Sequence, residues 1–288
     1  MISVVIPVHN EQATIAPLAH ALAQSLPADH EILFVDDGST DNTWNQIRAV
    51  HRPGYVRALR FRRNFGKTIA LQAGFAAARG HIIFTMDGDL QDDPAEIPRF
   101  LHMVEQGYDL VSGWKKVRHD PFTKVVASRL FNATVSLLGG LKLHDINCGF
   151  KAYRSEVAKN IHLQGEMHRF TPLLAHAMGF RVGELVVTHH PRRHGRSHYG
   201  FARLFKGFLD LITVLLLTRY KERPSHGFGL AAMLVSLLAI GLAWPAPLWS
   251  AACAVAAVVL LSAGLVAEIL IRRAPSGLPA WRVQEQLD

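Results

Sequence analysis

The sequence predicts an α/β protein with a mostly parallel sheet, followed by a C-terminal region that associates with a membrane. Short apolar runs alternate with amphipathic stretches of helical period, which is the pattern of βαβ units. Polar loops follow several of these runs, so they would share one edge of the sheet. Two segments near the C-terminus are almost uncharged, each close to the roughly 20 residues that cross a bilayer. The predicted strands are residues 3–8, 31–36, 55–61, 81–86 and 108–112.

Composition bounds the possible functions. A chain of 288 residues that is 49% hydrophobic can build one domain of roughly 200 residues and a smaller second part. The formal net charge of +8 indicates an anionic partner, which can be a nucleic acid, a phospholipid surface or a phosphorylated substrate. The two cysteines, Cys148 and Cys253, indicate neither a disulfide framework nor a zinc site. The N-terminus has no signal-peptide pattern, so we expect the first part in the cytoplasm.

The loops after the second and third predicted strands carry short polar side chains, a glycine and a lysine. Asp37 and Ser39 can accept hydrogen bonds from ribose hydroxyls or a base edge. Taken alone, residues 36–41 are equally well explained as a turn that caps the next helix. In the following loop Gly66 admits a close ligand and Lys67 can reach a diphosphate, although the spacing is not that of a P-loop.

The fourth predicted strand ends in an acidic turn. Asp87 and Asp89 are two residues apart, Gly88 allows a tight bend between them, and Gln91 adds a neutral oxygen. Such crowding favours a hard cation, Mg²⁺ or Mn²⁺, with positions left for phosphate oxygens. The alternative is a solvated acidic turn that caps the helix beginning near Pro94.

Together these segments resemble the nucleotide-sugar half of family 2 glycosyltransferases, which have the GT-A fold. The matching segments follow in the same order and spacing: residues 6–11 (IPVHNE), 35–39 (VDDGS), 64–67 (NFGK) and 86–91 (MDGDLQ). The acidic motif is similar to that of the polyprenyl-phosphate branch, which includes dolichyl-phosphate mannose synthases and undecaprenyl-phosphate glycosyltransferases. The resemblance covers about residues 1–200, and His9 stands where many members carry Tyr or Leu.

The resemblance implies transfer of a sugar, with inversion, from a UDP- or GDP-sugar to undecaprenyl or dolichyl phosphate. It implies a metal at Asp87, Asp89 and Gln91, with both acids also catalytic. It assigns the donor to residues at the ends of the strands and in a later basic loop: Pro7, His9, Glu11, Val35, Asp37, Ser39, Lys67, Asp87, Gly88, Arg193 and Ser197.

The acceptor side follows the fifth predicted strand. A helix predicted over residues 121–138 carries several basic residues, and the resemblance implies that Arg129 binds the acceptor phosphate. A solvated basic helix is the alternative. Residues 145–151 (DINCGFK) resemble a segment of the family in which Asp145 orients the acceptor or its arginines and Lys151 faces phosphate. For His168, in a segment that resembles the head of a family helix, a site role and a buried capping role stay open.

Residues 189–199 form a basic loop rich in histidine. Interleaved arginines would repel a cation, so the sequence does not favour a metal site there, and nucleic-acid binding is not expected. The loop resembles an R-x-x-G-x-S-K-Y motif, with Arg193, Ser197 and Tyr199 as counterparts and His198 in place of Lys. In the family this segment closes over the donor diphosphate and the lipid phosphate.

The C-terminal part predicts membrane attachment. Residues 201–215 have the apolar stripe of an interfacial helix, and residues 227–244 and 247–271 would form a transmembrane hairpin. Basic residues flank both ends of the hairpin, so the positive-inside rule places the catalytic domain in the cytoplasm, on a multi-pass protein of the inner membrane. A buried soluble hairpin is the alternative, and a homo-oligomer stays open. The expected organisation is a catalytic domain (1–200), an amphipathic helix (201–223), two transmembrane helices (224–273) and a cytoplasmic tail (274–288).

Two other functions are compatible with parts of this pattern. A processive polysaccharide synthase would usually have more membrane spans and a Q-x-x-R-W motif, which this sequence lacks. A non-catalytic, nucleotide-binding membrane adaptor would not need the intact Asp87, Asp89 and Gln91.

Overall fold

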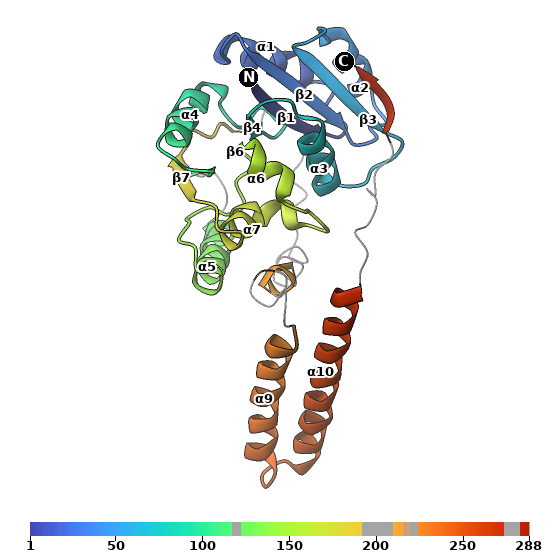
Figure 1. The fold of residues 1–288 in the computed structure, drawn as a ribbon, viewed down its shortest axis with the longest axis vertical. Helices are drawn as coiled ribbons and strands as arrows, with labels where there is room; N and C mark the ends of the chain where they lie inside the picture. The colour runs from blue at the N-terminus through green and yellow to red at the C-terminus, as the bar shows by residue number, and fades with distance from the viewer. Residues whose placement is uncertain (117–121, 192–209, 216–217, 219–223, 274–282, 288) are drawn as a thin grey trace. The chain divides into compact units, whose positions relative to one another are not determined.

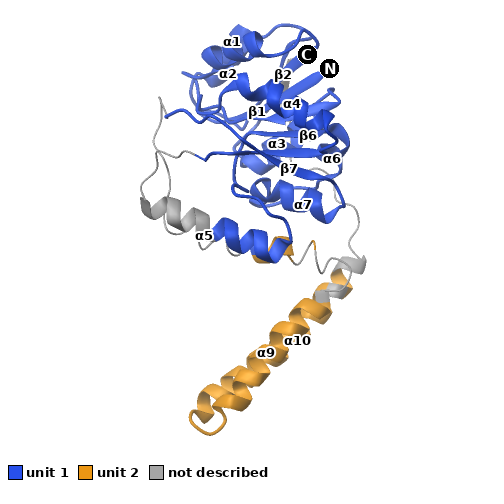
Figure 2. Ribbon diagram, turned by 90° about the vertical axis from the view of Figure 1, so that its left-hand side faces the viewer, with its two compact units in different colours: residues 1–211, 280–288 blue, residues 212–279 orange. Residues whose placement is uncertain are grey.

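A computed structural model describes residues 1–116, 122–191, 210–215, 218, 224–273 and 283–287. The chain divides into two compact units (Figure 2). The first unit consists of Met1–Leu211 together with Ala280–Asp288, and the second is Ile212–Pro279. Most of the predicted interfacial helix, residues 201–223, lies outside the described residues, and residues 210–215 are helical.

In the described part of the first unit, eight strands form one sheet in the order β7-β5-β6-β4-β1-β2-β3-β8 (Figure 1). The central pairs β4–β1, β1–β2 and β2–β3 are parallel, as is β5–β7, whereas β6 runs antiparallel to β4 and β5. The predicted α/β class with a mostly parallel sheet is therefore confirmed. The strands are β1 (Ile2–Val8), β2 (His30–Asp36), β3 (Val56–Phe61), β4 (Ile82–Thr85), β5 (Leu110–Trp114), β6 (Lys151–Arg154), β7 (Val182–Val186) and β8 (Val283–Leu287).

Helices connect these strands, and their positions follow the predicted pattern. The run of β2 is buried on both faces, as expected for a parallel strand covered by helices. Helix α3 packs on β1 and β2, and α4 packs on β5, β6 and β7. The helical elements of this unit are α1 (Ile15–Ser25), α2 (Thr43–Val50), α3 (Lys67–Ala77), η1 (Pro94–Glu96), α4 (Ile97–Glu105), α5 (Phe122–Gly139), α6 (Ser155–Asn160), η2 (Met167–Phe170) and α7 (Thr171–Ala177).

An aromatic cluster fixes the middle of the sheet. The ring centroids of Phe100 on α4 and Phe150 before β6 are 4.6 Å apart, and those of Phe84 on β4 and Phe100 are 5.9 Å apart. All three side chains are fully buried. Because Phe84 and Phe150 lie close to the ends of their segments, this packing sets the position of the loops that follow β4 and precede β6.

The C-terminus differs from the expected tail. Val283–Leu287 forms β8, which pairs antiparallel with β3 and covers what would otherwise be a sheet edge. The five predicted strands also omit β6 and β7, which have four and five residues. Runs this short carry little periodicity, and the β8 pairing joins segments more than 200 residues apart, so local pattern does not reveal them.

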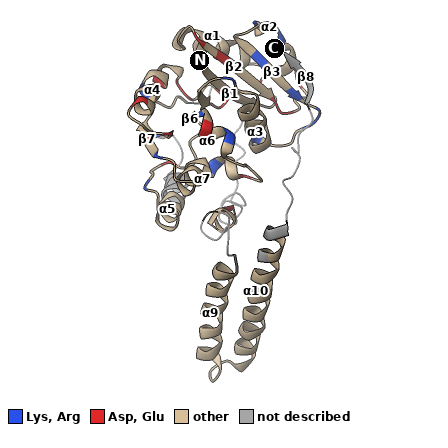
Figure 3. Ribbon diagram, in the orientation of Figure 1, with Lys and Arg blue, Asp and Glu red and all other residues tan. Residues whose placement is uncertain are grey.

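The second unit is a helical hairpin. Helices α9 (Pro224–Leu242) and α10 (Pro247–Arg273) contain two segments, Ser225–Leu242 and Pro247–Ala267, that are long and apolar enough to cross a membrane. Figure 3 shows no charged residue along these segments. Large apolar side chains such as Ile240 and Val258 are more than half exposed, which disfavours a buried soluble hairpin.

Candidate active site

Four loops meet at the carboxyl edge of the parallel strands and line an open cavity of about 290 Å³. Val35 and Ser39 are buried, and neither belongs to the cavity lining. The lining consists of predicted donor residues and their neighbours: Pro7, Val8, His9, Glu11, Asp37, Asn64, Gly66, Lys67, Asp87, Gly88 and Asp89.

Asp37 joins three of these loops. Its carboxylate accepts hydrogen bonds from the backbone N–H groups of Phe65 (2.7 Å) and Gly66 (2.8 Å), and its backbone carbonyl lies 3.0 Å from the His9 ring. Burial raises the pKa of Asp37 above its ordinary value, although the two N–H donors act in the opposite direction. Asp37 therefore holds the loop before Lys67 against the end of β1.

Ser39 acts beneath the cavity. Its hydroxyl accepts a hydrogen bond from the backbone N–H of Asn10 (2.9 Å), and its own N–H donates to the Asp36 carboxylate (2.9 Å). Residues 36–41 thus form a turn, as one of the two interpretations expected. The bond from Asn10 to Ser39 also connects the ends of β1 and β2. These bonds stabilise the loops that line the cavity.

In the acidic turn, one acid caps the following helix and two others line the cavity. Asp93 caps η1, because its carboxylate accepts a hydrogen bond from the N–H of Ala95 (2.9 Å). Asp87 and Asp89 instead line the cavity. Gly88 packs tightly on β1, and a Cβ there would lie 2.8 Å from Cγ1 of Val8. The predicted acids therefore lie where a ligand would meet them.

Asp87 forms an ion pair with Lys67 across the cavity. Burial opposes its charged form, but the ammonium groups of Lys67 and Lys115 outweigh this effect and hold the pKa of Asp87 well below its ordinary value. Gly149 lies against the same carboxylate, and a Cβ there would be 2.6 Å from the Asp87 Oδ1 atom. The acid is thus ionised at neutral pH, packed tightly against Gly149 and open to the cavity.

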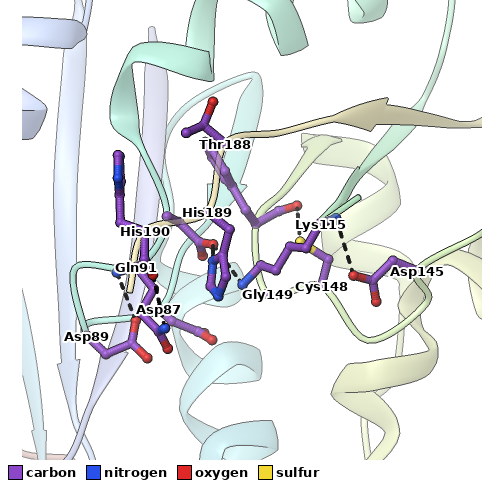
Figure 4. Close-up of polar contacts among 12 residues, drawn as sticks. Asp87, Asp89, Gln91, Lys115, Asp145, Cys148, Gly149, Thr188, His189 and His190 are labelled. Atoms are coloured by element: carbon purple, nitrogen blue, oxygen red, sulfur yellow. Dashed lines mark hydrogen bonds and ion pairs between the residues drawn. The ribbon is translucent and has the colours of Figure 1, made fainter. Parts of the chain in front are cut away.

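The oxygen atoms of Asp87 and Asp89 suit a hard divalent cation. Among the described residues no group of three or more His, Cys, Asp and Glu side chains could hold a metal by itself. Two carboxylates on a cavity wall fit an ion that takes its remaining ligands from phosphate or water. Gln91 lies beside them: its N–H donates to Asp89 (3.2 Å), and its side-chain amide donates to the carbonyl of His190 (3.2 Å; Figure 4).

His168 lies below the donor side. Its Nδ1 atom is 2.7 Å from the Thr68 hydroxyl, in the first turn of α3 and next to Lys67. Burial, with further contributions from Lys67 and Arg169, lowers its pKa well below the ordinary value. His168 is therefore a neutral, buried imidazole that supports the start of α3. Of the two roles left open for it, this position favours the buried structural role.

The acceptor side contains Asp145, whose side chain is buried in the middle of the loop between α5 and β6 (Figure 4). Its carboxylate lies 3.4 Å from the N–H of Lys115, and Glu184 on β7 accepts the N–H groups of His144 (2.9 Å) and Asp145 (2.8 Å). Asn132 of α5 donates to the carbonyl of His144 (2.8 Å). These bonds tie α5 to the Asp145 loop.

The structure does not describe the side chains of several predicted site residues, and it places another, Lys151, away from the expected position. Arg129 belongs to α5, but its side chain is outside the described residues, as are Arg193, Ser197, His198 and Tyr199. Lys151 differs from the expectation that it faces phosphate. It is 2% exposed, its ammonium donates to the carbonyl of Cys148, and burial lowers its pKa to about 8.

Three residues of this region have roles that the sequence did not reveal: Glu184, Asp92 and Lys115. Lys115 follows β5 directly, and its ammonium lies 2.8 Å from the buried Asp92 carboxylate. The signal available in the sequence was the number of acids, since Asp92 exceeds what capping and metal binding require.

The model of the family described as glycosyl transferase family 2 matches residues 3–161. A dodecaprenyl-phosphate galacturonate synthase of Rhizobium johnstonii is 42% identical over 248 residues, which are 83% of this chain and 73% of that protein. An undecaprenyl-phosphate 4-deoxy-4-formamido-L-arabinose transferase of Edwardsiella ictaluri is 37% identical over 258 residues, which are 85% and 79% of the two chains.

A solved structure with the same fold is glucosyl-3-phosphoglycerate synthase from Mycobacterium tuberculosis, in complex with Mn²⁺, UDP and phosphoglyceric acid. Its TM-score is 0.59 at 20% identity, and the match covers 75% of this chain and 77% of that chain. A second structure of that synthase, with Mn²⁺, UDP-glucose and phosphoglyceric acid, gives a TM-score of 0.56 at 22% identity over 75% and 78% of the chains.

Proposed function

Because the chain belongs to glycosyl transferase family 2, we propose that it transfers a sugar from a nucleoside-diphosphate sugar to a polyprenyl phosphate at the cytoplasmic face of the inner membrane. The observation that carries the proposal is the cavity in which Asp87 and Asp89 lie beside Lys67 at the edge of the sheet. The acceptor class rests on the two relatives above, which are named for dodecaprenyl and undecaprenyl phosphate and match more than four fifths of the chain.

On the donor side, the nucleotide occupies the end of the cavity near His9 and Asp37, and the diphosphate lies toward Lys67. Asp87 and Asp89, with Gln91 beside them, would hold Mg²⁺ or Mn²⁺. A divalent ion held there neutralises negative charge on the leaving diphosphate. UDP is the first nucleotide to test, because the structural neighbours named above contain UDP or UDP-glucose.

On the acceptor side, the attacking phosphate is already an anion, so it needs positioning more than a general base. We assign this task to Arg129 and to Arg193 and Arg196 of the basic loop, with Asp145 orienting these groups. Direct attack from this side inverts the anomeric centre. These assignments rest on the sequence motifs, since the arginine side chains lie outside the described residues.

The membrane location is supported by the path of the chain. The hairpin unit begins at Ile212 and ends at Pro279, and both of its ends continue into the catalytic unit, where β8 joins the sheet. Both ends of a hairpin whose helices each span once must lie on one side of the bilayer, which is the side of the catalytic unit.

A transfer assay with the full-length protein in vesicles tests the proposal. Labelled UDP-glucose, UDP-galacturonic acid and GDP-mannose are each offered with undecaprenyl phosphate, with and without chelator. We expect one donor to give a labelled lipid that depends on the polyprenyl phosphate and on a divalent ion. Label in a polymer would favour a processive synthase, and nucleotide binding without transfer would favour a non-catalytic adaptor.

A further inference from the structure

A buried ion pair lies between the two sides of the site. The Asp92 side chain is fully buried, and its Oδ1 atom is 2.8 Å from the Lys115 ammonium and 3.5 Å from Nδ1 of His189. The acid therefore has two basic groups within 3.5 Å and no exposed side-chain surface.

Lys115 connects this pair to the acceptor side. It follows β5 directly, and its backbone N–H lies 3.4 Å from the Asp145 carboxylate while its side chain extends to Asp92. Lys115 thus contacts Asp145 of the acceptor side with its backbone N–H. Its ammonium contacts Asp92, which follows the metal-binding turn.

The chain at the start of the basic loop contacts Asp92 and two acids close to it in the sequence. Three successive residues, Thr188, His189 and His190, contact Glu96, Asp92 and Asp93 respectively. The N–H of His190 also donates to the carbonyl of Gln91 (2.8 Å), and Asp92 and His189 form an isolated bridge. The first two residues of the basic loop, His189 and His190, therefore lie against the segment that follows the metal-binding turn.

We propose that Lys115 and Asp92 form a positioning pair that fixes the metal-binding turn relative to Asp145 and to the start of the basic loop. The inference rests on the proposed function and deepens it, because it assigns the residues that set the geometry between donor and acceptor. Asp92 directly follows Gln91 and is three residues from Asp89, so a shift of Asp92 moves the turn that bears the ligands.

The energetics of buried ion pairs support a geometric role. Removing two charges from water costs about as much as their attraction returns, and apolar residues of similar volume often replace such pairs without loss of stability. A pair retained at the junction of four segments therefore contributes a fixed position more than net stability. The position matters because a misplacement of about 1 Å can cost on the order of 100-fold in rate.

The chain offers a matched control. Glu31 and Arg57 form a second buried ion pair, also 2.8 Å long, near the amino ends of β2 and β3. Neither residue belongs to the lining of the cavity. The test compares the double variant Asp92→Asn/Lys115→Met with Glu31→Gln/Arg57→Met, both as full-length protein in vesicles with undecaprenyl phosphate.

Three quantities are measured for each variant: the midpoint of thermal unfolding, the Kd of UDP with Mn²⁺, and kcat for transfer at a temperature where the protein is folded. We expect Asp92→Asn/Lys115→Met to lower kcat on the order of 10- to 100-fold at unchanged Kd, as misplaced reacting groups would. The control should keep the wild-type kcat. The single variant Asp92→Asn, which keeps side-chain size, should fall in the same direction.

Wild-type kcat in the folded Asp92 variants would overturn the proposal, and so would an equal loss in the control pair, because both results assign the pair to stability alone. A loss confined to UDP binding would also overturn it. Failure of the wild-type protein to transfer any sugar would instead contradict the proposed function, so the two failures are distinct.

Discussion

The donor side and the acceptor side of the site are built in different ways. On the donor side the cavity is lined mainly by short loops at the ends of neighbouring parallel strands, and these loops bind one another, as Asp37 does with Gly66. On the acceptor side the partners come from distant segments: Glu184 binds the Asp145 loop from 39 residues away, and His190 contacts Asp93 from 97 residues away. Local motifs therefore describe the first side, and long-range packing makes the second.

This difference predicts how each side responds to substitution. Donor-side changes should alter binding of nucleotide and metal, because the cavity is lined by the substituted groups themselves. Acceptor-side changes should alter the rate at unchanged donor affinity, because they move groups relative to one another. The following predictions are ordered from the largest expected effect to the smallest.

The Asp89→Ala substitution should have the largest effect. It removes one of two cavity carboxylates that would hold the metal, with an expected loss of several kcal/mol of transition-state stabilisation, or on the order of 10³-fold in kcat. Donor binding should also lose its dependence on divalent ions. Transfer rates and UDP affinity with and without chelator check this, and normal turnover in chelator would show that Asp89 does not hold the ion.

The Glu184→Gln substitution probes the acceptor side. The carboxylate of Glu184 accepts the N–H groups of His144 and Asp145, and hydrogen bonds to a charged group contribute roughly 1.5–3 kcal/mol. We expect kcat to fall on the order of 10- to 100-fold while the Kd of UDP stays unchanged. Glu156→Gln on α6, at an exposed position, is the control. Reduced UDP affinity at unchanged kcat would break the division between the two sides.

The Lys67→Met substitution probes the donor side in two directions. Loss of the ammonium should weaken UDP binding by about tenfold, as expected for one charge-assisted contact. Because Lys67 pairs with Asp87, the same substitution should strengthen binding of Mn²⁺ alone. Calorimetry of UDP and of Mn²⁺ separately measures both effects, and unchanged Mn²⁺ affinity would show that the ion pair does not compete with the metal.

The smallest effect concerns His168, which supports the donor side from 100 residues away. Its pKa is lowered well below the ordinary 6.5, so below pH 6.5 the unfolded chain binds a proton that the folded chain does not. The free energy of unfolding should therefore fall as the pH drops below 6.5. His168→Gln should flatten this dependence by about 1 kcal/mol between pH 6.5 and 5.5. Equal slopes in denaturant titrations of both proteins would contradict this account of His168.

The convergence of the loops on one cavity could be predicted from the sequence, because its signals are local. The apolar runs marked the strands that precede Asp37 and Asp87, and parallel strands bring their carboxyl ends to one edge of the sheet. The same logic located Lys67 at the start of α3. Periodicity and length also identified the two apolar helices of the hairpin.

The acceptor side and the sheet edges were harder to predict for a physical reason. Lys151 belongs to a motif expected to face phosphate, but antiparallel pairing of β6 with β4 and β5 places its side chain in the core. The pairing of Lys115 with Asp92 joins two segments that no short motif links. Strand β8 returns to β3 after the hairpin, and five residues carry too little pattern to predict such a pairing.

The division between the two sides is tested most directly by one experiment on Asp37→Asn and Asp145→Asn: the Kd of a UDP-sugar and the single-turnover rate of transfer to undecaprenyl phosphate at saturating donor. Asp37 holds the loop before Lys67, so Asp37→Asn should raise the Kd and leave the saturated rate close to that of the wild-type protein. Asp145→Asn should lower the rate and leave the Kd unchanged. If both variants change both quantities to the same extent, donor binding and acceptor positioning are not separable in this protein.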